Sequence, residues 1–412
     1  MINRIKKNLP SKLLKSSIYL MFLQLFTMIA PLVSFPYLTR VMSIDSFGVL
    51  MMWFSFHAIG VLVVDFGFNL SATYKVAKSN GDKNEVGRLF YSVTVIKLGI
   101  AIIVALLILP YMIYNDLNSV TFSIVTLSVL LQSLSPIWIF QGIENMKAIT
   151  IYMAISKLLY VTSVLLFIDS GSEMYEILFY YSLSNFSFLV MSLFYLKKLG
   201  YSPKRVGIEY MTMVFKDSSS YFYSRAAVSI YTSSSVLIIG YYGGASQAGI
   251  YSSSEKIYNA IKGLVNSFSR ALFPYLTKTK DYQLLVKSTL TLFLLSIPCV
   301  IVCSLFSEQI LDFVYGEGYG SGNLVFMVFL IGISINIVSV NFGYPAFSAL
   351  RRVDLANKSV ILASIFQVSY LLLLYIFLDI NALYVSVGIV MTEIIALIYR
   401  LYYYFKLRKE NE

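Results

Sequence analysis

Long apolar stretches alternate with short polar connections along the whole chain. Six stretches contain no charged residue at all, at residues 17–38, 98–114, 120–143, 288–307, 324–350 and 359–378. A helix needs about 20 mostly apolar residues to cross the hydrocarbon core of a bilayer. Because these stretches are apolar on every side of a helix, a soluble fold could not bury all of them. The pattern therefore predicts an all-α, polytopic membrane protein.

The apolar pattern predicts about twelve membrane-spanning helices. In chain order they lie roughly at residues 17–39, 46–69, 89–114, 119–142, 149–168, 176–196, 219–241, 249–275, 286–308, 323–349, 358–378 and 382–405. Only 13% of the residues are charged and 58% are hydrophobic, whereas a soluble chain would carry about a quarter charged residues. These spans leave no room for a soluble catalytic domain.

Basic residues mark one side of the membrane. The two termini and every second connection hold 25 of the 32 lysines and arginines, whereas the other connections contain only Arg40. Basic residues accumulate on the cytoplasmic side, so both termini and the 197–217 connection are expected in the cytoplasm. We therefore expect a multi-pass membrane protein. The net charge of +11 reflects this orientation and attraction to anionic membrane lipids, and no module that binds nucleic acid is present.

The chain is expected to form two six-helix lobes, residues 1–200 and 201–412, separated by the longest polar connection. Weak internal similarity supports this division. Phe47-Gly48 opens the second predicted span and Ala248-Gly249 opens the eighth, while Pro136 and Pro345 lie late in the fourth and tenth. An even number of helices per lobe gives parallel repeats, which place a substrate path between the lobes.

Residues for catalysis, metal binding or redox chemistry are scarce. His57 is the only histidine, which excludes a multi-histidine metal site; it is either a polar packing residue or part of a transport pathway. Cys299 and Cys303 lie one helical turn apart and are interpreted as packing residues. No GxxxxGK[ST] loop occurs, so ATP is not the expected direct energy source. We predict no cofactor, no metal and no enzymatic activity.

Charged residues inside the predicted spans are the most informative feature. A charge at bilayer depth costs about 3 kcal/mol or more, so such residues usually face a cavity or a partner. Lys97 and Lys157 could instead extend toward the cytoplasmic interface. The cations are Lys97, Lys157, Arg225, Lys256, Lys262 and Arg270, and the anions are Asp65, Glu255 and Glu393.

The eighth predicted span carries a polar stripe. Turning by 100° per residue, its polar side chains fall within about 80° of one another; they are Glu255, Asn259, Lys262, Asn266 and Arg270. The stripe is either a set of interhelical ion pairs and hydrogen bonds or the wall of an aqueous cavity. We favour the cavity, because six cations against three anions leave an excess that an anionic substrate could neutralise. Serines and tyrosines of the seventh span suit a sugar-bearing path and helix packing equally.

Four segments carry a family resemblance. SPIWIFQGIENMK (135–147) and AGIYSSSEKIYNAIKGLVNSFSRALFPYLTK (248–278) are the most specific, with looser support from SFPYLTRVMSIDSFGVL (34–50) and VYGEGYGSG (314–322). Together they resemble the O-antigen and capsular polysaccharide repeat-unit flippases of the multidrug/oligosaccharidyl-lipid/polysaccharide exporter superfamily. The resemblance covers nearly the whole chain. It implies two six-helix lobes around a central cationic cavity, without a catalytic signature.

The resemblance also implies the function. The expected substrate is an undecaprenyl-diphosphate-linked oligosaccharide, flipped from the cytoplasmic to the periplasmic leaflet by a secondary transporter. We assign substrate binding to Arg225, Lys262 and Arg270, with Asn259 and Asn266 on the same stripe. Candidates for ion coupling are Asp65, Glu255 and Glu393. Proton, sodium and voltage all stay open as the driving force.

Three other functions compete with this prediction. A multidrug or cation antiporter of the same superfamily would favour a cavity rich in acidic residues, opposite to the observed charge excess. A membrane-embedded polysaccharide polymerase or ligase would need a substantial external loop with reactive groups, and the longest outside connection, about 308–322, is short and contains no histidine. A scaffold without transport activity would not explain the buried cations. Besides its substrate, the chain is expected to contact membrane lipids and other polysaccharide assembly proteins.

Overall fold

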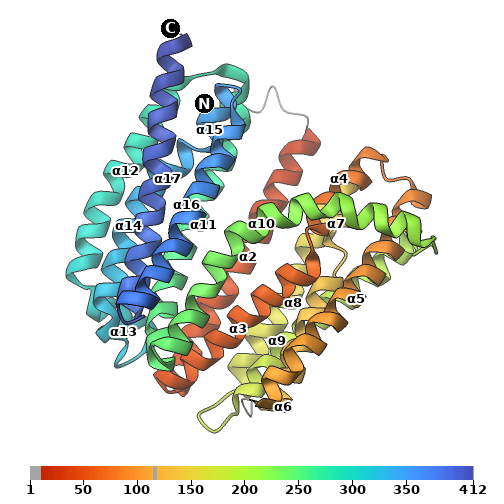
Figure 1. Cartoon of the computed structure of the whole chain (residues 1–412), viewed down its shortest axis with the longest axis horizontal. Coiled ribbons are helices and arrows are strands. Elements are labelled where there is room, and N and C mark those ends of the chain that lie inside the picture. The colour runs from red at the N-terminus through yellow and green to blue at the C-terminus, as the bar shows by residue number, and fades with distance from the viewer. Residues whose placement is uncertain (1–10, 115–117, 412) are drawn as a thin grey trace. The chain divides into compact units, whose positions relative to one another are not determined.

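A computed structural model describes residues 11–114 and 118–411, which are helical over most of their length and contain no strand (Figure 1). The helices up to the central connection are α2 (Ser11–Val41), α3 (Ile44–Asp65), α4 (Phe68–Lys78), α5 (Lys83–Tyr114), α6 (Ser119–Leu134), α7 (Ile137–Gly142), α8 (Met146–Phe167) and α9 (Met174–Lys198). Those after it are α10 (Ile208–Tyr242), α11 (Ala245–Thr279), α12 (Tyr282–Leu305), α13 (Ser307–Tyr315), the 3-10 turn η1 (Tyr319–Gly322), α14 (Asn323–Asn341), α15 (Tyr344–Ala349), α16 (Val353–Phe377) and α17 (Ala382–Asn411). The predicted all-α fold class is confirmed.

Ten segments of the described residues are long and apolar enough to cross a membrane. They correspond to all the predicted spans except the seventh and eighth. Those two are the helices α10 and α11, each 35 residues long, or about 50 Å at 1.5 Å per residue. Their length suffices for a span, but their serines, tyrosines and charged residues make them too polar to be recognised from hydropathy. Membrane crossing by α10 and α11 stays a prediction.

Three predicted spans are each broken into two helices. The predicted 46–69 span ends as α3 at Asp65, because Phe66 (φ 44°) and Gly67 (φ 78°) are left-handed before α4 begins. The predicted 119–142 span breaks before α7 at Pro136, which has no N–H to donate to a continuing helix. The predicted 323–349 span breaks at Gly343, where Pro345 occupies the first turn of α15. Proline is well tolerated in the first turn of a helix and poorly tolerated further in.

The order of elements repeats between the two parts of the chain. The six-residue helices α7 and α15 are each followed by one left-handed residue, Glu144 (φ 59°) and Arg351 (φ 58°), and then by a long helix. Left-handed Asn80 and Lys280 end α4 and α11 in the same way. An aspartate then accepts a backbone hydrogen bond at the start of α5 and of α12, Asp82 from Glu85 and Asp281 from Leu284, both at 2.9 Å. These matching turns support an internal repeat.

The described residues form two compact units. Unit 1 comprises the chain up to Ser34 together with Phe56–Ser229, and unit 2 comprises Phe35–Ser55 together with Ile230–Glu412. The boundaries therefore fall inside α2, α3 and α10. These units are groups of residues in mutual contact, and they do not test the division into repeated lobes. The lobes at 1–200 and 201–412 stay a prediction.

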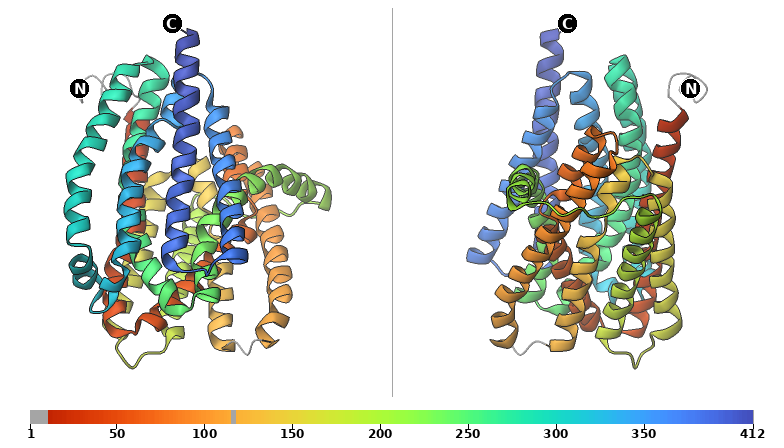
Figure 2. Two further views of the ribbon diagram at one scale, coloured as in Figure 1. Left: turned by 60° about the vertical axis from the view of Figure 1, so that its left-hand side comes forward. Right: turned by 90° about the vertical axis from the view of Figure 1, so that its right-hand side faces the viewer.

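Helices pack along their lengths within each unit. In unit 2, α14 contacts α11, α12 and α17, and α16 packs on α17 (Figure 2, green-blue to blue). In unit 1, α9 contacts α6 and α8, and α4 packs on α7. The core of unit 1 includes the buried aromatic rings Phe68, Phe90, Trp138, Phe140 and Phe188. These contacts hold the polar side chains described below at fixed positions inside each unit.

Two glycines allow a close helix crossing in unit 2. The first turns of α3 and α11 cross at Gly48 and Gly249, the residues that the sequence singled out as matching. A Cβ atom on Gly249 would lie 2.7 Å from the carbonyl oxygen of Ile44, and one on Gly48 would overlap the carbonyl oxygen of Ala245. Since real Cβ contacts are longer than 3 Å, only glycine permits this approach of the two backbones.

The central connection is anchored to unit 1 rather than loose. The backbone N–H of Lys204 donates to the Gly87 carbonyl at 2.8 Å, and the Lys75 ammonium lies 2.7 Å from the Asp217 carboxylate. Tyr210 donates to the Glu85 carboxylate. Burial, followed by this hydrogen bond and charge, raises the pKa of the Tyr210 phenol. These contacts attach the start of α10 to α4 and α5.

Candidate functional site

The polar stripe on α11 contains an ion pair with a distant helix. Lys262 Nζ lies 2.6 Å from Glu393 Oε1 of α17, and it also lies 5.3 Å from the ring centre of Tyr258. The Lys262 and Glu393 side chains keep 28% and 17% of their surface exposed. The structure thus brings together a residue predicted to bind substrate and one predicted to couple ions. The partner of Lys262 is Glu393 and not Glu255, which pairs instead with Lys256 at 3.5 Å.

The other polar residues of the stripe differ in exposure. Asn259 and Arg270 are exposed, whereas Asn266 and Glu255 are half-buried. Ser269, at the edge of the same face, is buried beside the Val340 carbonyl at 3.5 Å. Both interpretations of the stripe therefore apply to part of it. Lys262 forms an interhelical ion pair, whereas Asn259 and Arg270 present surface that a ligand could contact. Their assignment to substrate binding stays a prediction.

Arg400 is a buried cation that the sequence pattern did not single out. Its side chain donates to Ser359 Oγ at 2.9 Å and to both oxygens of Ser339 at 2.8 Å, and only 8% of the residue is exposed. Its charge also acts on Glu393. By its sequence position it lies close to the basic residues of the C-terminal end. Its spacing of seven residues from Glu393 puts both on one face of α17, which is the signal that could have identified it.

Unit 1 contains a fully buried ion pair. Lys97 Nζ of α5 lies 2.9 Å from Asp65 Oδ1 at the end of α3, and it donates to the Ser133 carbonyl at 2.8 Å. Lys97 and Asp65 are 1% and 3% exposed. The lysine therefore does not extend to the interface and offers no surface to a ligand. Asp65, a candidate for ion coupling, already has a cation from another helix, which favours a structural role for this pair.

A second lysine of unit 1 lies in a different setting. Lys157 is the twelfth of the 22 residues of α8, and its Nζ lies 5.0 Å from the ring centre of Tyr181 on α9. Edge-to-face contacts join the Tyr181 ring to His57 of α3 at 5.2 Å and to Tyr160 at 5.5 Å. No carboxylate lies within ion-pair distance of Lys157 in the described part of the chain. We call Lys157, Tyr181, His57 and Tyr160 the Lys157 cluster.

The side chain of Arg225 lies outside the described residues. Helix α10 includes this position, but the proposed contact of Arg225 with substrate has no geometry to test it. In the residues that the structure describes, no group of three or more histidine, cysteine or acidic side chains could hold a metal ion.

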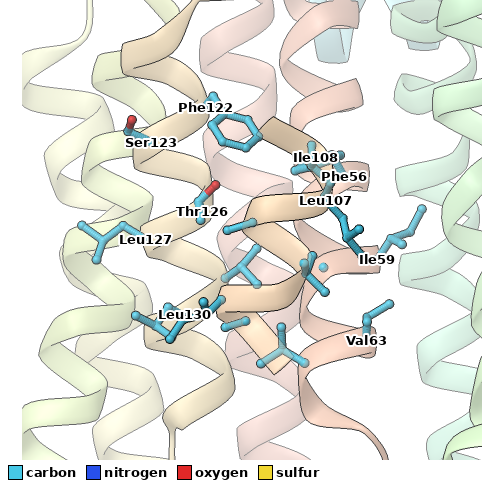
Figure 3. Close-up of a pocket in the computed structure, with 17 residues that line it drawn as sticks. Phe56, Ile59, Val63, Leu107, Ile108, Phe122, Ser123, Thr126, Leu127 and Leu130 are labelled. Atoms are coloured by element: carbon cyan, nitrogen blue, oxygen red, sulfur yellow. The ribbon is translucent and has the colours of Figure 1, made fainter. Parts of the chain in front are cut away.

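An apolar groove in unit 1 provides a contrast to these polar sites. It has a volume of 590 Å³ and lies among α3, α5 and α6, with Phe56, Ile59, Leu107 and Leu130 in its lining (Figure 3). Ser123 and Thr126 are the only polar residues among the 17 that line it. This lining suits a hydrocarbon chain and offers no charge to a polar headgroup.

Comparison with known proteins gives a consistent result. The sequence profile of a family described as "Polysaccharide biosynthesis protein" matches residues 13–280. A protein of Escherichia coli (strain K12) named as an O-antigen transporter is 26% identical over 337 residues, which is 78% of this chain and 81% of that protein.

Two solved transporters share the fold at low sequence identity. The lipid II flippase MurJ in an inward closed conformation superposes with a TM-score of 0.71 at 15% identity, covering 95% of this chain and 87% of that one. An inward-facing multidrug resistance transporter of the MATE family gives a TM-score of 0.70 at 13% identity, covering 94% and 96%. Both results support the all-α fold, and the MATE structure belongs to the MOP superfamily.

Proposed function

Because the chain belongs to the polysaccharide biosynthesis protein family, we propose that it is a flippase for undecaprenyl-diphosphate-linked oligosaccharide. It moves O-antigen or capsule repeat units from the cytoplasmic to the periplasmic leaflet of a bacterial inner membrane. The observation that carries the proposal is the match to an O-antigen transporter along 78% of this chain. The cations on membrane helices agree with it, because a diphosphate headgroup is anionic and must be shielded from hydrocarbon while it crosses the membrane.

In this proposal the diphosphate is bound by Arg270, Arg225 and Lys262. Arginine suits capture, since its planar fork can bind two phosphate oxygens at once. Lysine suits a transfer point, since a mobile point charge holds a passing anion less rigidly. Lys262 is paired with Glu393 at 2.6 Å, so the incoming diphosphate exchanges with this carboxylate. Asn259 and Asn266 supply hydrogen bonds on the same helix face.

Ion coupling follows from that exchange. When Lys262 pairs with the diphosphate, the Glu393 carboxylate loses its nearest cation. Its affinity for a proton or a sodium ion then rises. The positive charge of Arg400 still acts on Glu393 and limits this rise in affinity. Glu393 is therefore our first choice for the coupling residue, ahead of Glu255 and of Asp65, which is fully buried against Lys97. Secondary transport also fits a sequence without a nucleotide-binding loop.

A multidrug antiporter is the second candidate, because a MATE transporter shares the fold with a TM-score of 0.70. Cationic drugs would require carboxylates that are open to the ligand. Asp65 and Glu393 are instead each within 3 Å of a lysine. The charges thus favour an anionic substrate.

The orientation of the chain is a part of the proposal. Cysteines introduced at Asn118, Ser172 and Ser246 should react with an impermeant thiol reagent added outside intact cells, and one at Ser202 should not. Cys299 and Cys303 are first replaced by serine so that they give no background. Labelling of a cysteine at Ser202 would show that the proposed orientation is wrong.

Deletion of the gene tests the function. Labelled lipid-linked repeat units should accumulate on the cytoplasmic leaflet, and surface polysaccharide should disappear. A plasmid copy of the intact chain restores both. Normal surface polysaccharide in the deletion strain, or repeat units that reach the outer leaflet without the protein, would rule the proposal out.

A further inference from the structure

The depth of Lys157 makes its charge unusual. Its place as the twelfth residue of the 22-residue helix α8 lies about 16 Å along the axis from either end. A lysine side chain is too short to carry its ammonium over that distance to the interface, so extension toward water does not explain it. A charge near the middle of a membrane helix normally faces a cavity or pairs with a partner.

The protein provides Lys157 with a ring but with no carboxylate. Within the described ranges, Lys97, Lys256 and Lys262 each have a carboxylate oxygen within 3.5 Å. Lys157 has only the face of Tyr181, at 5.0 Å. A ring face attracts a cation much less strongly than a carboxylate does inside a protein. The described residues therefore give the ammonium no counter-charge.

A second group of the Lys157 cluster is also incomplete. His57 is 4% exposed, and its Nε2 atom is buried without a hydrogen-bond partner. A buried polar atom without a partner is costly in a purely structural network. A lone ammonium and an unused imidazole nitrogen around the same Tyr181 ring indicate that a polar ligand completes this cluster.

We propose that the Lys157 cluster is an anion-binding subsite in unit 1 that takes a phosphate group of a lipid. This inference rests on the proposed function for the source of the phosphate, which is the diphosphate of the lipid-linked oligosaccharide. Lys157 supplies the charge, Tyr181 holds the ammonium in position, and His57 Nε2 supplies a hydrogen bond once the cluster opens. The subsite is separate from the polar stripe of α11, whose lysine is already neutralised by Glu393.

Binding to the purified full-length chain tests the subsite. The protein is placed in nanodiscs of uncharged, zwitterionic phosphatidylcholine, and radiolabelled undecaprenyl diphosphate is the probe. Lys157→Gln should weaken binding about tenfold or more, the usual effect of losing a charge-assisted hydrogen bond, and Lys157→Arg should recover most of it. Lys256→Gln is the matched control, since Lys256 also lies over a ring, 6.0 Å from Phe35, but has a carboxylate partner. Its affinity should equal that of the wild type.

Competition identifies the source of the phosphate. Inorganic diphosphate should displace the probe from the wild type and do so poorly from Lys157→Gln. If phosphatidylglycerol added to the nanodisc displaces the probe and inorganic diphosphate does not, the occupant is a phospholipid headgroup and the assignment to substrate is overturned. If inorganic diphosphate binds through Lys157 and the lipid probe does not bind, the anion subsite is supported and the proposed flippase function is wrong.

Thermal unfolding separates binding from a structural role. Removal of a cation that lacks a counter-charge should leave the melting temperature of Lys157→Gln close to that of the wild type. Equal affinity of Lys157→Gln and the wild type for both probes would overturn the proposal. A large drop in melting temperature with unchanged affinity would also overturn it, because Lys157 would then serve the fold alone.

Discussion

Two lysines of this protein lie against tyrosine rings, and their surroundings differ in one respect. Lys262 in unit 2 lies 5.3 Å from the Tyr258 ring centre and 2.6 Å from the Glu393 carboxylate. Lys157 in unit 1 lies 5.0 Å from the Tyr181 ring centre, and the described residues place no carboxylate within 4 Å of it. The lysine of unit 2 is paired with a carboxylate, whereas none of the described residues provides a carboxylate for the lysine of unit 1.

The repeat shows where this difference arises. Glu393 is the twelfth residue of α17, and the twelfth residue of α9, the matching helix of the first part of the chain, is Asn185. Asn185 is buried and donates to Ser128 Oγ at 3.0 Å. A glutamate carboxylate and the amide of an asparagine, whose side chain is one methylene shorter, thus occupy corresponding places. The net charge around each lysine depends on the residue type at a few such positions. The shared arrangement of helices does not fix that residue type.

The largest expected effect is on transport through the polar stripe of α11. Lys262→Gln together with Arg270→Gln should stop surface polysaccharide while the protein still inserts and folds, because two cations proposed to bind the diphosphate are gone. Arg270→Lys alone should keep part of the activity, since the charge remains and the bidentate fork does not. Surface polysaccharide is measured by blotting, with protein level as the control. Full display by the double variant would refute the role of these residues.

Stability gives the next largest effect and separates paired from unpaired lysines. Lys97→Met should lower the free energy of unfolding by about 3–5 kcal/mol, because it removes the lysine that lies 2.9 Å from the buried Asp65 carboxylate. Lys157→Gln should change it by less than about 1 kcal/mol, since no ion pair is broken. Detergent-solubilised protein is compared by thermal unfolding.

The double variant Lys97→Met, Asp65→Asn is the control for this comparison. It removes both charges and should recover part of the stability that Lys97→Met loses. Equal losses for Lys97→Met and Lys157→Gln would mean that the ion pair does not distinguish the two lysines.

A carboxylate can be added to unit 1 to make the two sites alike. Asn185→Glu places a carboxylate at the position that corresponds to Glu393, one helical turn from Tyr181 on α9. We expect the new carboxylate to neutralise Lys157 and to weaken binding of undecaprenyl diphosphate about tenfold, or about 1.4 kcal/mol. Asn185→Gln, which keeps the longer side chain without the charge, should bind like the wild type. Tighter binding by Asn185→Glu would contradict the anion subsite.

The sequence predicted much of the fold because apolar length is a local property. The all-α class and ten spans could be read from uninterrupted hydrophobic stretches, whereas α10 and α11 are too polar to be recognised by the same measure. The breaks at Pro136 and Gly343 could have been placed from residue type. The left-handed Phe66 could not, since a bulky residue rarely adopts that conformation.

The candidate site was harder to predict, because its partners come from different helices. Glu393 and Asp65 have no cation near them on their own helices, and which lysine reaches each of them depends on how the helices pack. Arg400 resembled a cytoplasmic anchor because it lies among basic residues near the C-terminal end. Its burial against Ser339 and Ser359 depends on the packing of α14 and α16 onto α17.

The smallest expected effect concerns the ring shared by the Lys157 cluster. Tyr181→Leu removes the ring face under the Lys157 ammonium, a contact that contributes about 0.5–1 kcal/mol, so the probe should bind about two to five times more weakly. Tyr181→Phe keeps that face and loses only the hydroxyl that lies 3.3 Å from Gln132 Oε1. Its affinity should stay within about twofold of the wild type, because Lys157 still contacts the same ring. In unit 2 the corresponding change, Tyr258→Leu, should matter less, since Glu393 rather than the ring holds Lys262. Binding measured by the same nanodisc assay ranks the three variants. If Tyr181→Phe binds as weakly as Tyr181→Leu, the hydroxyl and not the ring face supports the subsite, and the similarity between the two lysine sites is then only geometric.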